Sequence, residues 1–168
     1  MDVPDGFVRF ENQGPFLEHV GPVHVLEGAD ELVLGLRTER RHANHRGTVQ
    51  GGLLSTFADF ALGRAIEADA DDGRERATVS LTVDFLKPAN PGDWIESRTR
   101  VDRVGGTLSF ADCSLTVEGR EIVRARVLGG RRVGRRDQAG TSCDRSPATR
   151  ELSSSMPIRA STSSASAR

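Results

Sequence analysis

One acidic side chain, Asp59, lies within the most apolar stretch of the sequence, residues 49–66, which read VQGGLLSTFADFALGRAI. Burying an ionised carboxylate without partners is costly, so an acid in such a stretch needs a reason. A carboxylate held in an apolar site can act as a nucleophile or as a general base. The alternative is a narrow solvent-facing strip of the helix shared with Ser55, Thr56 and Arg64, and helical propensity alone does not decide between the two.

Two glycines, Gly51 and Gly52, begin the same predicted helix. The backbone N–H groups at a helix start have no partner within the helix, and without side chains beside them a substrate carbonyl can approach closely. Donors placed in this way form an oxyanion hole, which stabilises the transition state by roughly 3 kcal/mol per well-placed donor. The alternative is an ordinary helix start that happens to contain glycine. Gly51 and Asp59 are about 12 Å apart along a helix, so they can serve one reacting carbon only if two chains pair. We therefore expect catalysis to require a dimer in which each site takes Gly51 from one chain and Asp59 from the other.

The remaining sequence predicts the elements that must hold these residues. Alternating apolar residues predict two strands before the helix and four after it, at residues 21–28, 31–38, 77–86, 94–104, 107–119 and 120–129, with a short amphipathic segment at 3–11. Hairpin-connected strands around one helix indicate an α+β fold with an antiparallel sheet. Because apolar residues go nearly all the way round the helix, we expect it to be enclosed on every side. In the strand after the helix, we expect Val79, Leu81, Val83 and Phe85 to share one face.

Composition separates a folded part, residues 1–130, from a tail, residues 131–168. The tail is rich in Ser and holds eight Arg against three acidic residues, so the first part carries a net charge of −6 within a total of −1. We expect one folded domain and a disordered tail. An acidic domain argues against nucleic acid as a partner, and the absence of a signal peptide or a long apolar run predicts a soluble, cytoplasmic protein without a membrane segment.

The stretch NHRGTVQGGLLSTFADFALG resembles the signature of hotdog-fold acyl-CoA thioesterases of the PaaI-like (phenylacetate-degradation type) subfamily. The subfamily pattern has Asn, then Gly, then two adjacent Gly, then Asp eight residues after the first of that pair. This sequence matches it at Asn44, Gly47, Gly51, Gly52 and Asp59. The strand ending at Pro88 and the hairpin at residues 103–127 also resemble the subfamily, so the resemblance covers about residues 21–128.

The resemblance implies a hotdog fold, in which an antiparallel β-sheet is wrapped around one long central α-helix. It also implies hydrolysis of an acyl-CoA to free acid and CoA by a homodimer or homotetramer with shared sites, with no cofactor or metal beyond the CoA of the substrate. Asp59 would be the nucleophile or general base, the Gly51 N–H would bind the carbonyl oxygen, and Asn44 would position that region. Thr78 falls where relatives have a Ser or Thr that orients water or the carboxylate, although a plain strand Thr is the alternative.

Gln50 stands where the subfamily commonly has His before the two glycines. Its amide can donate and accept hydrogen bonds but cannot ionise near neutral pH, which leaves Asp59 as the ionisable group. The rival functions are a non-catalytic acyl-CoA-binding module and a hydratase, and the second is weakened by the missing His. His42 and His45 lack the neighbours of a zinc site, and Cys113 has no base at a recognisable spacing.

Overall fold

The computed structural model of the protein describes residues 3–29, 31–72 and 76–131. Beyond Arg131, the predicted tail lies outside the described residues. The last strand runs to Arg131, one residue past the predicted domain boundary at residue 130.

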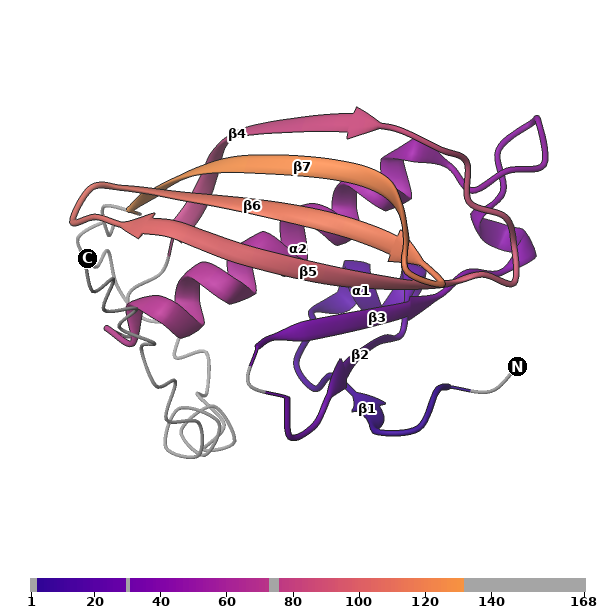
Figure 1. The fold of residues 1–168 in the computed structure, drawn as a ribbon, viewed down its shortest axis with the longest axis horizontal. Helices are drawn as coiled ribbons and strands as arrows, with labels where there is room; N and C mark the ends of the chain where they lie inside the picture. The colour runs from indigo at the N-terminus through magenta and orange to yellow at the C-terminus, as the bar shows by residue number, and fades with distance from the viewer. Residues whose placement is uncertain (1–2, 30, 73–75, 132–168) are drawn as a thin grey trace, which may run out of the picture. The chain divides into compact units, whose positions relative to one another are not determined.

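Seven strands form one sheet in the order β1-β2-β3-β5-β6-β7-β4, and every neighbouring pair is antiparallel (Figure 1). The strands are β1 (Phe7–Arg9), β2 (Val23–Leu26), β3 (Val33–Arg37), β4 (Arg76–Phe85), β5 (Trp94–Val104), β6 (Leu108–Val117) and β7 (Arg120–Arg131). The six predicted strands correspond to β2 through β7, so the predicted antiparallel α+β fold is confirmed. A two-residue hairpin turn joins β6 to β7. Glu118 and Gly119 both take positive φ (49° and 74°), as a turn of type I′ requires.

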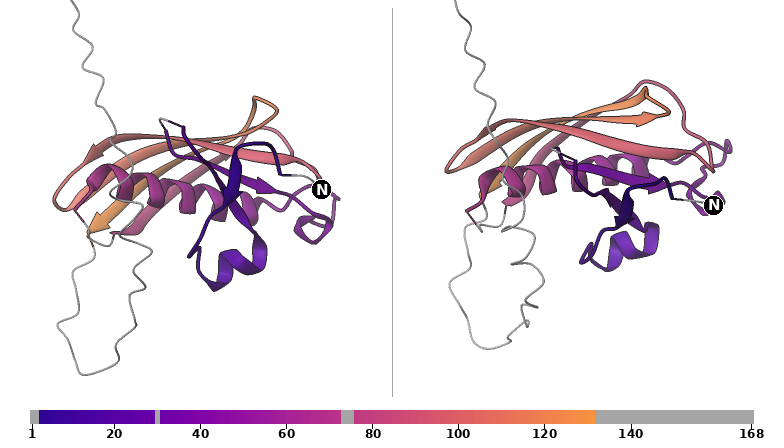
Figure 2. Two further views of the ribbon diagram at one scale, coloured as in Figure 1. Left: turned by 90° about the horizontal axis from the view of Figure 1, so that it is seen from below. Right: turned by 60° about the horizontal axis from the view of Figure 1, so that its bottom comes forward.

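The long helix α2 (Gly51–Ala70) lies lengthwise beneath the curved sheet (Figure 2). One side of the helix is buried against the sheet, through Leu54, Phe57, Ala58, Ala61, Leu62, Ala65 and Ile66. The opposite side is half-buried in the single chain and includes Ser55, Thr56, Asp59 and Arg64. The expectation of enclosure on every side is therefore wrong for one chain, because the sheet covers only one side of the helix. Among the helices of the described ranges, none has the length and hydropathy needed to cross a membrane.

A short helix, α1 (Pro15–Val20), lies on the side of α2 away from the sheet (Figure 2). It was not predicted, since six residues are too few to show a helical period, although Pro15 at its first position is a known helix-start signal. Leu17 is the residue of α1 that is buried. The predicted amphipathic segment at residues 3–11 contains the three residues of β1.

A β-bulge interrupts the pairing of β4 with β7 between Thr78 and Ser80. Val79 is the extra residue, and its side chain is 63% exposed instead of sharing the buried face of Leu81. The predicted face of Val79 is therefore wrong. A bulge shifts the alternation of side chains by one position, so Thr78 takes the face that regular alternation would have given to Val79.

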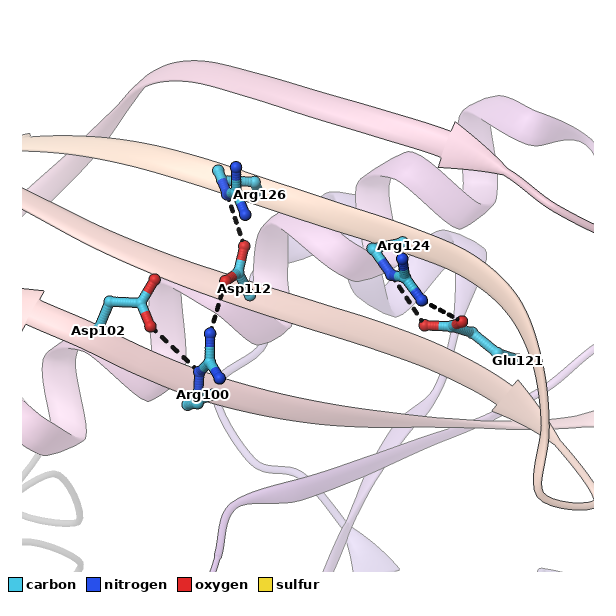
Figure 3. A network of polar contacts seen from close by, with 6 residues as sticks. All are labelled: Arg100, Asp102, Asp112, Glu121, Arg124 and Arg126. Atoms are coloured by element: carbon cyan, nitrogen blue, oxygen red, sulfur yellow. Dashed lines mark hydrogen bonds and ion pairs between the residues drawn. The ribbon is translucent and has the colours of Figure 1, made fainter.

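Charged side chains cover the face of the sheet that points away from α2 (Figure 3). Asp112 on β6 accepts hydrogen bonds from Arg126 on β7 (2.7 Å) and Arg100 on β5 (3.1 Å). These two cations, Arg126 first, lower the pKa of the Asp112 carboxyl. Such exposed pairs contribute little to stability, about 0–1 kcal/mol each. These pairs mark the exposed face of the sheet, on which Leu108 and Phe110 of β6 are also exposed.

Candidate functional site

The start of α2 presents backbone N–H groups that no side chain caps. Gln50 is the N-cap residue, its backbone is extended, and its side chain makes no capping hydrogen bond. The backbone of Gln50 is fixed by its own N–H, which donates to the His42 carbonyl (2.8 Å). Since the first N–H groups of a helix lack partners within the helix, Gly51 and Gly52 can offer theirs to a ligand.

Asn44 braces the loop that leads into this helix start. Its amide Nδ2 donates to the Thr48 hydroxyl (3.0 Å), and its Oδ1 accepts the N–H of Arg46 (2.8 Å). The backbone N–H of Asn44 also donates to the carbonyl of Thr48 (2.8 Å), and Gly47 completes the turn with a φ of 83°. Both polar ends of the side chain thus take part in the hydrogen bonds of the loop, and Asn44 holds the segment that leads to the start of α2.

Asp59 and Thr78 lie together, although 19 residues separate them in the sequence. The Thr78 hydroxyl donates a 2.7 Å hydrogen bond to Oδ1 of Asp59. This contact exists because the bulge at Val79 turns Thr78 toward α2. One carboxylate oxygen is thereby held in place, and Oδ2 is left for chemistry.

Two hollows follow the half-buried side of α2, with Phe16 and Thr56 lining both. The first has a volume of about 390 Å³ and contains Asp59. The second has a volume of about 450 Å³ and is lined by Asn44, Gln50 and Gly52, among others. The predicted site residues therefore form two groups in a single chain, one around Asp59 and one around the helix start.

The second hollow has a basic rim. Arg41 and His45 belong to its lining, and Arg40 and Arg46 are exposed beside them in the chain. Arg41 also anchors α1, because its guanidinium donates to the carbonyls of His19 (2.9 Å) and Gly21 (2.6 Å).

His42 is buried at this rim, with 6% of its surface exposed. Its Nδ1 accepts the N–H of Glu39 (2.9 Å), so the lone pair of that nitrogen is already used. Burial, with the nearby charge of Arg41, lowers the pKa of His42 below the ordinary 6.5, which favours a neutral ring with its proton on Nε2. Within the parts of the chain that the structure describes, no three His, Cys, Asp or Glu side chains gather in a metal-binding arrangement.

Cys113 is buried in β6, and burial raises the pKa of its thiol to about 12. A thiol that stays protonated at neutral pH is a poor nucleophile. It therefore packs as a core residue.

The sequence interpretation missed the contribution of α1 to the Asp59 hollow. Gln13, Phe16 and Leu17 line that hollow together with Phe60 of α2. The pair Gly14-Pro15 was the available signal, because Gly followed by Pro often precedes a helix.

Comparison with known proteins supports one family. The sequence profile of the thioesterase superfamily matches residues 46–123, from the loop before α2 into β7. A Pseudomonas aeruginosa protein that bears the name of an esterase is 41% identical over 116 residues, which is 68% of this chain and 87% of that protein. Mouse acyl-coenzyme A thioesterase 13 is 29% identical over 87 residues, 52% of this chain and 61% of that enzyme. The E. coli PaaI protein of the phenylacetic acid degradation operon shares the fold, with a TM-score of 0.65 at 18% identity over 73% of this chain and 87% of that structure.

Proposed function

This chain belongs to the thioesterase superfamily and is a thioester hydrolase, and from that premise we propose that it hydrolyses acyl-CoA to free acid and CoA. Asp59 is the nucleophile or general base, and the Gly51 N–H binds the carbonyl oxygen. The observation that carries the proposal is the hydrogen bond from Thr78 to Asp59, which holds the acid of α2 at the wall of a hollow. We also propose a cytoplasmic location, as expected from the sequence.

Asp59 can promote hydrolysis by either of two mechanisms. As a nucleophile, Oδ2 of Asp59 attacks the thioester carbon, the CoA thiolate leaves, and water then hydrolyses the mixed anhydride to the free acid and Asp59. As a general base, Asp59 accepts a proton from water while that water attacks the same carbon, and the proton finally reaches the thiolate. In both forms negative charge develops on the carbonyl oxygen, where a helix-start N–H stabilises it. Gln50 can add a neutral hydrogen bond beside that oxygen but no proton transfer.

The site is shared between two chains, because the two groups cannot meet within one. Along α2, Gly51 and Asp59 are about 12 Å apart, whereas reacting groups must converge within about 3 Å of the carbon. A second copy of the chain, related by a two-fold axis, would supply the missing group to each site.

The open edge of β4 is our candidate for this two-fold contact. Within the described sheet β4 pairs with β7 alone, and an open strand edge is a template for another strand. Thr78 near the start of β4 contacts Asp59, and the ring of Phe85 at its end lies over Gly51, 3.2 Å from where a Cβ would be. If two copies of β4 pair antiparallel about Thr82, Ser80 of one chain comes opposite Asp84 of the other, and beyond the bulge Thr78 comes opposite Phe85. The same operation brings Asp59 to the partner's Gly51, giving a homodimer, or a tetramer built from two such dimers.

The basic rim of the second hollow suits the phosphates of CoA. His45 lines this hollow together with Gln50 and Gly52, and the exposed Arg40 and Arg46 adjoin the lining residues Arg41 and His45 in the chain. Arg and Lys are the usual partners of phosphate groups. We assign the CoA part of the substrate to this rim.

Thiol release from a panel of acyl-CoAs tests the proposal. Turnover by the purified full chain supports it, and a protein-only blank accounts for thiols of the protein itself. Binding of acyl-CoA without turnover would instead support a non-catalytic binding module. Loss of enoyl-CoA absorbance without thiol release would support a hydratase.

A further inference from the structure

We propose that the Asp59 hollow between α1 and α2 is the pocket for the acyl group, and that Phe60 limits the length of acyl chain it takes. The inference rests on the proposed thioester hydrolysis and adds the direction in which the substrate lies. The acyl group points toward α1 of the chain that supplies Asp59, and the CoA passes the basic rim of the other chain.

The lining of this hollow fits a hydrocarbon group. Pro15, Phe16, Leu17 and Phe60 form most of its surface. Gln13 offers little to a polar ligand, because it is 6% exposed, its Nε2 donates to the Phe10 carbonyl (2.7 Å) and its Oε1 accepts the Val23 N–H (2.9 Å).

The two hollows differ in chemistry, and this difference fixes the orientation. The Asp59 hollow has apolar walls with one acid, which would repel the phosphates of CoA. The other hollow is lined by His45 and Gln50, whose exposed side chains can face a charged and amide-rich group. The thioester carbon lies beside Asp59, where the Asp59 hollow of one chain meets the second hollow of its partner.

The wall formed by α1 is fixed at both ends. Gln13 ties the chain before α1 to β2, and Arg41 binds the carbonyls of His19 and Gly21 at the other end. A rigid wall gives the pocket a definite length, and about 390 Å³ is at the small end of the 300–1,000 Å³ range of small-molecule sites. We therefore expect a preference for short to medium acyl chains.

Phe60 is the side chain placed to set the limit. It directly follows Asp59, and its ring packs edge-on against Phe10 with centroids 5.5 Å apart and planes at 88°. The guanidinium of Arg64 lies over the same ring, 5.8 Å from its centroid. Held by both neighbours, the ring cannot easily swing away from a longer chain.

The test is chain-length selectivity in the Phe60→Ala variant of the full chain. Kinetics with acetyl-, butyryl-, hexanoyl-, octanoyl- and decanoyl-CoA give kcat/KM for each substrate. In wild type, each methylene that fits should raise kcat/KM by about fourfold, the equivalent of ~0.8 kcal/mol per buried CH₂, until a limit is reached. In Phe60→Ala the limit should move to longer chains, raising the decanoyl-to-butyryl ratio at least about tenfold.

Controls make the outcomes distinct. Phe110→Ala removes a ring that is 40% exposed on the opposite face of the sheet, and it should leave the ratios unchanged. Phe60→Leu is a milder variant that keeps the test valid if Phe60→Ala does not fold. Ratios within twofold of wild type in both Phe60 variants would overturn the inference while leaving the proposed hydrolysis intact. A wild-type protein that releases no thiol from any of these substrates would overturn the proposed function and this inference with it.

Discussion

Replacing Gly51 by Pro should remove one hydrogen-bond donor from the start of α2 and almost nothing else. Gly51 is the first helical residue, the position at which Pro is favoured because its missing N–H has no helical partner. The preceding residue, Gln50, already has φ −64° and ψ 129°, the extended conformation that Pro requires before it. If the Gly51 N–H binds the carbonyl oxygen in the transition state, its loss should lower kcat by about 10²–10³, as for other oxyanion-hole donors.

Gly51→Ala is the matched control. Both variants place a Cβ 3.2 Å from the ring of Phe85, which is 55% exposed and can move by the few tenths of an ångström needed. The alanine variant keeps the N–H, so it should retain most of the activity. The ratio of the two kcat values therefore isolates the donor, with thiol release as the assay and a thermal transition as the check on folding. Two variants with kcat values within a few-fold of each other would refute the role of this N–H.

Four other perturbations test the same geometry. Asp59→Asn should lower kcat roughly 10²–10⁴-fold while leaving the thermal transition in place, and retention of most activity would discard the acid as the reacting group. Thr78→Val should lower kcat about tenfold or more, since a hydrogen bond to a charged group is worth about 1.5–3 kcal/mol. Thr78→Ser keeps the hydroxyl and should stay near the wild-type kcat. Equal activity of the two variants would show that the hydroxyl does not contribute to catalysis. Arg46→Glu should raise KM for an acyl-CoA but leave hydrolysis of a short thioester without phosphates unchanged, and an equal effect on both substrates would contradict phosphate binding. Burial, with Arg9 near His24 and Arg41 near His42, lowers the pKa of both rings below 6.5. The stability that these neutral rings contribute should therefore be complete above pH 6.5, and the free energy of unfolding should decrease as the pH falls below it. Urea titrations at pH 7.5 and 5.5 that give the same free energy of unfolding would contradict this.

The strands and the long helix could be predicted because their sequences carry strong local signals. Alternation marks β5 and β6, and the unbroken apolar run marks α2. The bulge at Val79 was not predictable in this way, since in the sequence the apolar alternation continues unbroken from Val79 to Phe85 and the extra residue shows only in the pairing with β7. That one residue decides whether Thr78 faces Asp59.

The candidate site was predictable in its parts and not in its surroundings. The spacing from Gly51 to Asp59 is a property of any helix, so the proposal of a site shared by two chains could be made from the sequence alone. The hollow beside Asp59 depends on α1, whose six residues have too little periodicity to be recognised. Whether the side of α2 that contains Asp59 is open depends on how far the sheet curves around the helix, and the sequence of the helix does not contain that information.

Mixing two inactive variants tests the shared site most directly. Asp59→Asn and Gly51→Pro chains, unfolded together in equal amounts and refolded, should form mixed dimers in which one site contains both intact groups. About a quarter of the wild-type activity should return, because half of the dimers are mixed and each rebuilds one of two sites. If the refolded mixture contains mixed dimers but stays as inactive as the two separate variants, the two groups do not serve one carbonyl, and the account is contradicted.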